Sequence, residues 1–157
     1  MVGGDELRAV MGRFPAGVAV VTVDLNGQRV GLTVASLVSL SLEPPRVGFA
    51  IRRDAALHEL LRESPELAIS VLAEGQEQLA QHFARGVPPI ALWQGIELRD
   101  AEGPPQLQGS LAWLRGRVEH EHAAGDHTFF VAGVGAAEPG ARALRPLVLH
   151  DQRYAAL

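Results

Sequence analysis

Apolar, β-branched residues dominate the early part of the chain and predict a strand followed by a tight turn. Residues 18–23 read Val-Ala-Val-Val-Thr-Val, and such runs favour extended backbone. Asn26-Gly27 follows, and this pair is a strong hairpin signal because both central residues of a type I′ turn need a positive φ. A return strand is expected from about residue 29 to residue 35. This part of the chain therefore predicts an antiparallel hairpin.

Similar apolar runs recur along the rest of the chain and are bounded by Pro, Gly or polar residues. Gly125-Asp126 lies between two of them, which predicts a second tight turn. The strands expected after the first hairpin are residues 46–51, 67–72, 110–120, 127–136 and 147–149.

Apolar residues spaced three and four apart predict three short helices. Asp5 and Asp54 stand where a capping side chain would begin two of them, and Pro15 ends the first pattern. The region 85–108 is interrupted by Pro and Gly and is expected to be loop-rich. The expected helices are residues 5–13, 54–63 and 74–84.

Six or seven strands and three short helices indicate a mainly β fold. Tight turns between strands favour an antiparallel barrel or sandwich with peripheral helices over a doubly wound α/β sheet. No Gly-x-Gly-x-x-Gly follows a strand, so the dinucleotide-binding fingerprint is missing. The length of 157 residues suits one domain over residues 1–157.

The composition removes several classes of catalyst and partner. The chain has no cysteine, and all 14 of its basic residues are arginine. Thiolate nucleophiles, iron–sulfur clusters, Schiff bases and Walker-type lysines are therefore excluded. A net charge of −4 offers no nucleic-acid-binding surface. The apolar runs are too short for a membrane span and the N-terminus does not resemble a signal peptide, so a cytoplasmic protein is expected.

Two segments could contact an anionic or polar ligand. Arg52-Arg53 lies between a strand and a helix start, where guanidinium groups and backbone N–H groups together hold phosphate. Two solvated surface arginines are the simpler alternative. Residues 33–41 carry small and hydroxyl-bearing side chains that let backbone amides approach a ligand closely. A polar loop rim would have the same composition.

Histidines concentrate near the second turn. His127 opens an apolar strand after Gly125-Asp126, where an imidazole could act as acid, base or hydrogen-bond partner of a ligand. A turn in which Gly and Asp serve only backbone geometry is the alternative. His120 and His122 point to one face of a strand, but the spacing fixes no third metal ligand, and no metal site is expected.

Four segments match a known family in their order along the chain. They are Arg13-Phe14-Pro15-Ala16-Gly17-Val18, residues 31–45, Leu79-Ala80-x-x-Phe83-Ala84 and residues 125–131. With these segments the chain resembles the short-chain flavin reductases, the reductase components of two-component flavin monooxygenases such as 4-hydroxyphenylacetate 3-monooxygenase. The resemblance covers nearly the whole chain. Its specific part is the serine-rich segment combined with the Gly-Asp-His turn.

The resemblance implies an FMN-binding split β-barrel that holds FMN or FAD noncovalently, usually in a homodimer with its pockets near the subunit interface. The implied reaction is hydride transfer from NADH or NADPH to the flavin, and the reduced flavin diffuses to a partner monooxygenase. Such a reaction needs no protein nucleophile, because the protein supplies position, stacking and electrostatics.

The resemblance also assigns residues to the flavin site. Arg52 and Arg53 would lie near the flavin phosphate, Phe83 and Ala84 would border the site, and His127 would lie beside flavin and nicotinamide. Tyr154 would stand at the pocket edge. The residues expected to line the flavin directly are Thr33, Val34, Ala35, Ser36, Ser39 and Ser41.

One departure from the family pattern concerns the phosphate. Many relatives carry Ser or Thr shortly after the strand that ends near residue 51, whereas this chain has Asp54-Ala55-Ala56. Either Arg52, Arg53 and backbone amides suffice, or flavin affinity is reduced, or the ligand differs. Two alternatives therefore stand beside the reductase: a flavin-binding electron carrier with little NAD(P)H turnover, and a binding module of this fold without flavin.

Overall fold

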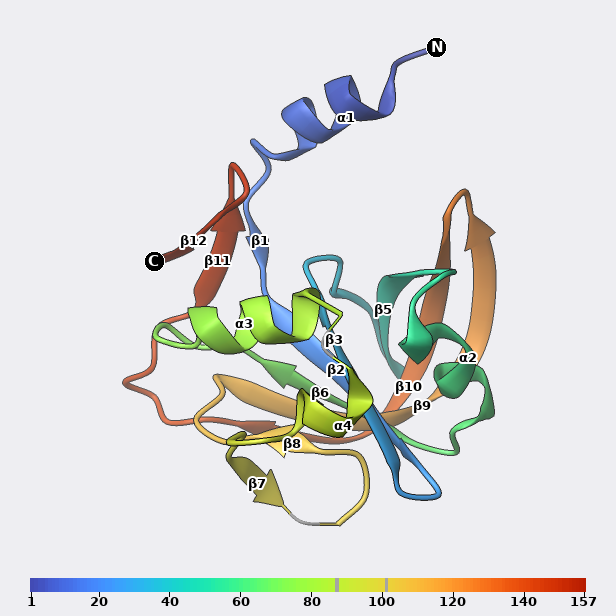
Figure 1. Ribbon diagram of the computed structural model, residues 1–157, viewed down its shortest axis with the longest axis vertical. Helices are drawn as coiled ribbons and strands as arrows, with labels where there is room; N and C mark the ends of the chain where they lie inside the picture. Colours follow the sequence, from blue (N-terminus) through green and yellow to red (C-terminus); the bar gives the residue numbers. More distant parts are fainter. Residues whose placement is uncertain (87, 101) are drawn as a thin grey trace.

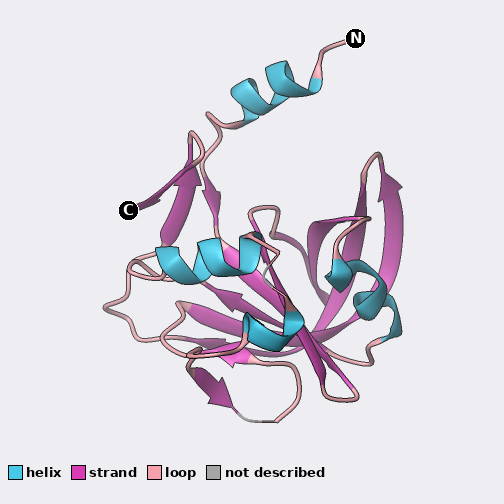
Figure 2. Ribbon diagram, viewed as in Figure 1, coloured by secondary structure: helices cyan, strands magenta, loops and turns pink. Residues whose placement is uncertain are grey.

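Strands form most of the ordered framework, and the helices lie at its periphery (Figure 2). The computed structural model describes residues 1–86, 88–100 and 102–157. Its main sheet has seven strands in the order β3-β2-β6-β9-β10-β5-β4, and every neighbouring pair is antiparallel. The strands are β2 (Ala19–Leu25), β3 (Gln28–Val34), β4 (Val38–Leu42), β5 (Pro45–Arg52), β6 (Leu67–Val71), β9 (Ala112–Ala124) and β10 (His127–Pro139).

The remaining strands form two small sheets. The N-terminal segment pairs with the C-terminal hairpin, so the two ends of the chain lie on the same side of the molecule (Figure 1). A two-stranded sheet lies in the region expected to be loop-rich. The strands are β1 (Ala16–Gly17), β11 (Leu147–His150) and β12 (Arg153–Ala156) in the first small sheet, and β7 (Leu98–Asp100) and β8 (Gln106–Leu107) in the second.

Four short helices accompany the sheets: α1 (Gly4–Met11), α2 (Ala56–Glu63), α3 (Glu77–Ala84) and α4 (Pro89–Leu92). Helix α1 extends away from the sheets and has no buried residue (Figure 1). Helices α2 and α3 each bury one face against the strands, as their apolar spacing predicts. None of the helices in the described residues is long and apolar enough to cross a membrane.

The first predicted hairpin is confirmed in detail. Asn26 and Gly27 have φ values of 54° and 84°, which are the positive values that a type I′ turn requires. The turn joins β2 to β3, and their register pairs Leu25 with Gln28. The return strand ends at Val34, one residue earlier than expected.

The side chains of β2 point alternately into two separate clusters of the core. Val21 points into one cluster with Phe49 and Phe130, while Val20 points into the other with Phe83. Successive side chains of a strand face opposite sides, so a continuous apolar run supplies both clusters. The continuous run in the sequence therefore reflects a strand covered on both faces.

Gly31 lets α3 approach the sheet closely. A Cβ atom at this position would lie 3.0 Å from Phe83 Cδ1 and 3.2 Å from Thr22 Cγ2, closer than nearly all real contacts of this kind. The absence of a side chain on Gly31 thus makes room for the Phe83 ring beside β3.

Several sequence-based expectations are wrong in their details. Asp54 does not cap α2, whose first residues have no side-chain cap, because the Asp54 carboxylate is turned toward Arg52. Helix α3 begins at Glu77 rather than residue 74, since Gly75 adopts a φ of 90° that starts a turn. Strands β4 and β12 were not expected, and neither were the short elements β1, α4, β7 and β8.

The mainly β, antiparallel prediction is confirmed. Within the described residues, the hydrogen-bonded ladders do not close into a ring, because β3 and β4 stand at the two ends of the seven-stranded sheet. The opening that they leave positions the candidate site.

Candidate functional site

A cavity lies where β3 and β5 approach each other without forming a ladder. Strand β4 pairs with β5 only from Pro45 to Gly48, so the rest of β5 has no strand beside it on this side in the described pairings. A side chain bridges the opening instead: Ala50 N donates a hydrogen bond to Ser36 Oγ at 2.9 Å. Ser36 thereby ties the end of β3 to the middle of β5.

The cavity has a volume of about 460 Å³, within the usual range of small-molecule pockets. Seven of the residues expected at the flavin line it. Leu32 and Ala50 complete the wall; Leu32 belongs to the family segment 31–45 without having been assigned to the site, and no motif included Ala50. The seven expected residues are Thr33, Val34, Ala35, Ser36, Arg52, Ala84 and His127.

Strand register places His127 beside Arg52. The two residues are direct partners in the β5–β10 ladder, so their side chains leave the sheet on the same face, about 5 Å apart at Cβ. Residues separated by 75 positions in sequence therefore meet at one cavity. No local spacing in the sequence could show this pairing.

The turn before β10 orients the His127 ring. His127 Nδ1 lies 2.8 Å from Asp126 Oδ1, and this hydrogen bond, together with the charge on the histidine, lowers the pKa of Asp126 below its ordinary value of 3.8. Because an ionised carboxylate only accepts, Nδ1 donates and Nε2 is the ring atom left for other contacts. The His127 side chain is 38% exposed, so a ligand in the cavity could reach it.

Arg52 and Arg53 have different roles in the structure. Arg52 Nε and Nη2 donate to the two carboxylate oxygens of Asp54 at 3.0 and 2.6 Å. Arg53 N donates to Asp126 O at 3.1 Å, which joins the end of β5 to the turn that carries His127. Arg52 lines the cavity, whereas Arg53 does not.

The expected hydroxyl groups hold the walls of the cavity. Thr33 Oγ1 donates to Ala80 O at 2.6 Å and fixes α3 to β3. Ser36 Oγ accepts a hydrogen bond from Ala50 N and donates one to Ala50 O at 3.4 Å. These hydroxyls therefore hold the backbone that surrounds the cavity.

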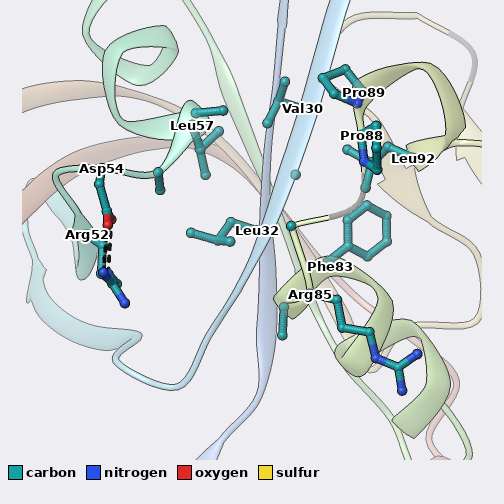
Figure 3. A pocket seen from close by; sticks show the side chains of 15 residues that line it. Val30, Leu32, Arg52, Asp54, Leu57, Phe83, Arg85, Pro88, Pro89 and Leu92 are labelled. Carbon is teal, nitrogen blue, oxygen red and sulfur yellow. Dashed lines mark hydrogen bonds and ion pairs between the residues drawn. The ribbon is translucent and has the colours of Figure 1, made fainter.

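A second cavity of about 460 Å³ adjoins the first and shares Leu32, Arg52 and Ala84 with it. Figure 3 shows Val30 and Leu32 between two groups of side chains, with Arg52, Asp54 and Leu57 on one side. The other side consists of Phe83, Arg85, Pro88, Pro89 and Leu92. Phe83 thus borders the neighbouring cavity, and Arg52 stands between the two.

Besides Arg53, three expected residues lie outside both cavities. Ser39 and Ser41 are on β4, opposite Val47 and Arg46 of β5, and line neither of the two cavities. Tyr154 is on β12, where it packs against the second core cluster and lines a separate depression. The structure therefore brings together residues 33–36, Arg52, Ala84 and His127, and leaves these three outside.

Tyr154 is the single tyrosine of the chain, so its titration can be followed without overlap from another tyrosine. Burial raises the pKa of Tyr154 above its ordinary value of 10.0. We expect the alkaline rise in ultraviolet absorbance to occur at a higher pH than for a free tyrosine derivative. The folded-state pKa is the higher one, so stability is lost as pH rises from 10 through that value. A midpoint at or below that of the free derivative would place Tyr154 in solvent.

The histidine pair on β9 does not assemble a metal site. His120 and His122 are exposed, opposite Val131 and Phe129 of β10. Among residues 1–86, 88–100 and 102–157, no group of three or more His, Cys, Asp or Glu side chains is placed to hold a metal ion.

One buried contact beneath the site was not anticipated. His58 Nε2 lies 2.8 Å from Thr128 Oγ1, and both residues are buried. Thr128 follows His127, so this hydrogen bond fixes α2 to the strand that carries the candidate imidazole. The sequence signal was a histidine next to Leu57 and three residues before Leu61, within the apolar face of α2.

Comparison with known proteins identifies the same family as the motifs. Residues 11–157 match the sequence model described as "Flavin reductase like domain". An NADH:FMN oxidoreductase of Rhodococcus qingshengii is 37% identical over 95% of this chain and 79% of its own length. The reductase component of 4-hydroxyphenylacetate 3-monooxygenase of Thermus thermophilus is 35% identical over 96% of this chain and 94% of its own.

A solved structure shares the architecture over the whole length. The NADH:FAD oxidoreductase of Streptomyces globisporus C-1027 superposes with a TM-score of 0.92 at 33% identity, covering 100% of this chain and 96% of the other. A structure of that protein in complex with NAD and FAD fragments superposes with a TM-score of 0.90, at 33% identity over 99% of this chain and 94% of the other. The sequence match, the shared fold and the cavity agree, and the chain belongs to the flavin reductase like domain family.

Proposed function

We propose that this protein is an NAD(P)H-dependent flavin reductase whose flavin binds in the cavity between β3 and β5. The observation that carries the proposal is the meeting of residues 33–36, Arg52 and His127 around one cavity of about 460 Å³. A bound flavin would accept a hydride from the nicotinamide and a proton from the medium, giving reduced flavin and oxidised nucleotide. FMN and FAD both fit the proposal, as do NADH and NADPH.

The chain's own residues supply position and charge. Strand β3 is an edge strand, so backbone groups on its outer side face the cavity and can hydrogen-bond to the polar edge of a flavin ring. Arg52 offers a bidentate guanidinium for phosphate, and Arg53 adds a second positive charge nearby. His127, whose Nε2 is free of the Asp126 contact, would lie beside flavin and nicotinamide.

The remaining expectations about the site stay proposals with different support. Phe83 borders the adjoining cavity on the side opposite Arg52 (Figure 3), so it would border the flavin site there. Ser39, Ser41 and Tyr154 would reach a flavin only if a second subunit or a shift of β4 brought the surfaces together. The structure therefore supports a role in flavin binding less for these three residues than for those that line the two cavities.

We propose that the 157-residue chain forms one split-barrel domain and pairs as a homodimer. The opening between β3 and β5, bridged by Ser36, supports the split barrel. Exposed apolar side chains on α1 and on β4 support a partner surface, because large exposed apolar patches mark interaction sites. They are Leu7, Val10 and Met11 on α1, Phe14 after it, and Val38, Leu40 and Leu42 on β4.

The homodimer has a direct test. Light scattering on the purified protein is expected to give about twice the chain mass of 16.8 kDa at micromolar concentration. Replacing Leu42, which is 88% exposed, with aspartate should shift the mass toward that of one chain. A single-chain mass for the unaltered protein would contradict the proposed dimer.

A monooxygenase is the proposed consumer of the reduced flavin. Relatives named as reductase components of 4-hydroxyphenylacetate and 4-nitrophenol monooxygenases support this assignment. The dependence on a nicotinamide nucleotide further supports a cytoplasmic location.

Steady-state kinetics test the reductase activity. We expect loss of NADH or NADPH absorbance that requires both the protein and added FMN or FAD, and oxygenase product when a partner oxygenase is supplied. A flavin that binds but is reduced only very slowly would instead identify an electron carrier. Failure to bind either flavin would leave a binding module of this fold.

A further inference from the structure

Asp54 occupies a position at the proposed phosphate site where its charge opposes the ligand. The carboxylate accepts two hydrogen bonds from Arg52, at 3.0 and 2.6 Å, in the bidentate geometry that arginine also uses for phosphate. Figure 3 shows this pair at one side of the cavity that it borders. Arg52, the best hydrogen-bond donor to a phosphate at the site, is therefore already paired with an anion of the same chain.

The pair is positioned to be exchanged for a ligand. Arg52 lines both adjoining cavities, whereas Asp54 lines only the one that Phe83 also borders. The Arg52 and Asp54 side chains are 63% and 69% exposed, and ion pairs this exposed are held weakly. A phosphate group entering from the cavity could therefore displace the carboxylate without breaking any buried contact.

We propose that Asp54 is a built-in competitor for the flavin phosphate at Arg52 and weakens flavin binding so that flavin exchanges as a substrate. The proposal rests on the flavin site proposed above. Binding must separate Arg52 from Asp54 and then bring a phosphate of charge between −1.5 and −2 close to the released carboxylate. Both effects oppose the ligand. Weak binding suits a reductase that releases its product to another protein.

The rest of the local sequence does not offset this charge. Ala55 and Ala56 follow, and α2 begins without a side-chain cap. Arg53 is the other cation beside Arg52 in the chain, and its side chain has no hydrogen bond or ion pair within the described residues. Of these two arginines, Arg52 is the one that lines the cavity, and it is also the one that Asp54 occupies.

The test compares two flavins with Asp54→Asn, which keeps the shape of the side chain and removes its charge. Fluorescence titration measures the affinity for FMN and for riboflavin, which lacks the phosphate. We expect FMN to bind about tenfold more tightly to the variant, as expected for removing one like charge close to the phosphate. Riboflavin affinity should stay unchanged.

The matched control is Glu63→Gln, which makes the same change in net charge at the opposite end of α2. Glu63 is exposed and lines neither cavity. This variant should leave both flavin affinities unchanged. An equal gain in FMN affinity from Glu63→Gln would assign the effect to net charge and overturn the proposal.

A second comparison separates competition from simple repulsion. In an Arg52→Gln background, Asp54 has no guanidinium to occupy, so Asp54→Asn should improve FMN binding clearly less than it does in the unaltered protein. An equal gain in both backgrounds would overturn competition at Arg52. Unchanged FMN affinity in the single variant would also overturn it, provided the unaltered protein binds FMN. If the unaltered protein binds neither flavin, the proposed function itself fails.

Discussion

Replacing His127 with alanine is expected to slow NADH-dependent flavin reduction about a hundredfold while changing flavin affinity less than about threefold. The imidazole lines the cavity, with Nδ1 held by Asp126 and Nε2 left for other contacts. In the proposed site it would act on the nicotinamide and on proton movement at the flavin. Most of the cavity wall comes from residues 32–36 and Ala50, which would hold the flavin without His127.

Anaerobic stopped-flow measurement of the reduction rate and fluorescence titration of flavin binding separate the two effects. His122→Ala is the matched control, since His122 is exposed on the same face of the sheet and does not line the cavity. Its reduction rate should stay near that of the unaltered protein. Equal losses of rate and affinity in His127→Ala would refute the proposed role.

Replacing Phe83 with alanine is expected to lower the free energy of unfolding by about 3–5 kcal/mol, a large share of the stability of a typical domain. The side chain is 1% exposed and belongs to the second core cluster. Its ring lies 5.2 Å from that of Trp93 between centroids and packs over Gly31. Alanine would leave a void that the backbone of β3 and α3 could close only in part.

Urea unfolding followed by circular dichroism measures this loss. Ile90→Ala is a suitable comparison, because Ile90 is 90% exposed on α4 and its removal should change stability by less than about 0.5 kcal/mol. A loss below about 1 kcal/mol for Phe83→Ala would show that this wall of the adjoining cavity is not close-packed.

Local sequence patterns predicted the elements well where backbone chemistry decides the structure. The Asn26-Gly27 turn and the strands around it follow from the positive φ values that these residues adopt readily. The start of α3 was misplaced because the polar residues 74–76 form a turn in which Gly75 has a positive φ. Strand β12 is short and has no β-branched residue, so its existence depends on pairing with β11.

The sequence predicted which residues form the site better than it predicted how those residues interact. The motifs selected residues 33–36, Arg52 and His127, and the structure brings them to one cavity. Spacing could not show that Arg52 pairs with Asp54, since the same aspartate is a good helix cap in sequence terms. Likewise, the hydroxyls of Thr33 and Ser36 bond to backbone far along the chain, which no local pattern encodes.

Reduction by a nicotinamide nucleotide of flavin bound between β3 and β5 can be observed in the visible absorbance of the FMN-saturated protein after anaerobic mixing with NADH. We expect rapid bleaching of the flavin band, complete at one NADH per flavin and much faster than for free FMN. Bleaching no faster than that of free FMN would show that the protein does not catalyse this reduction.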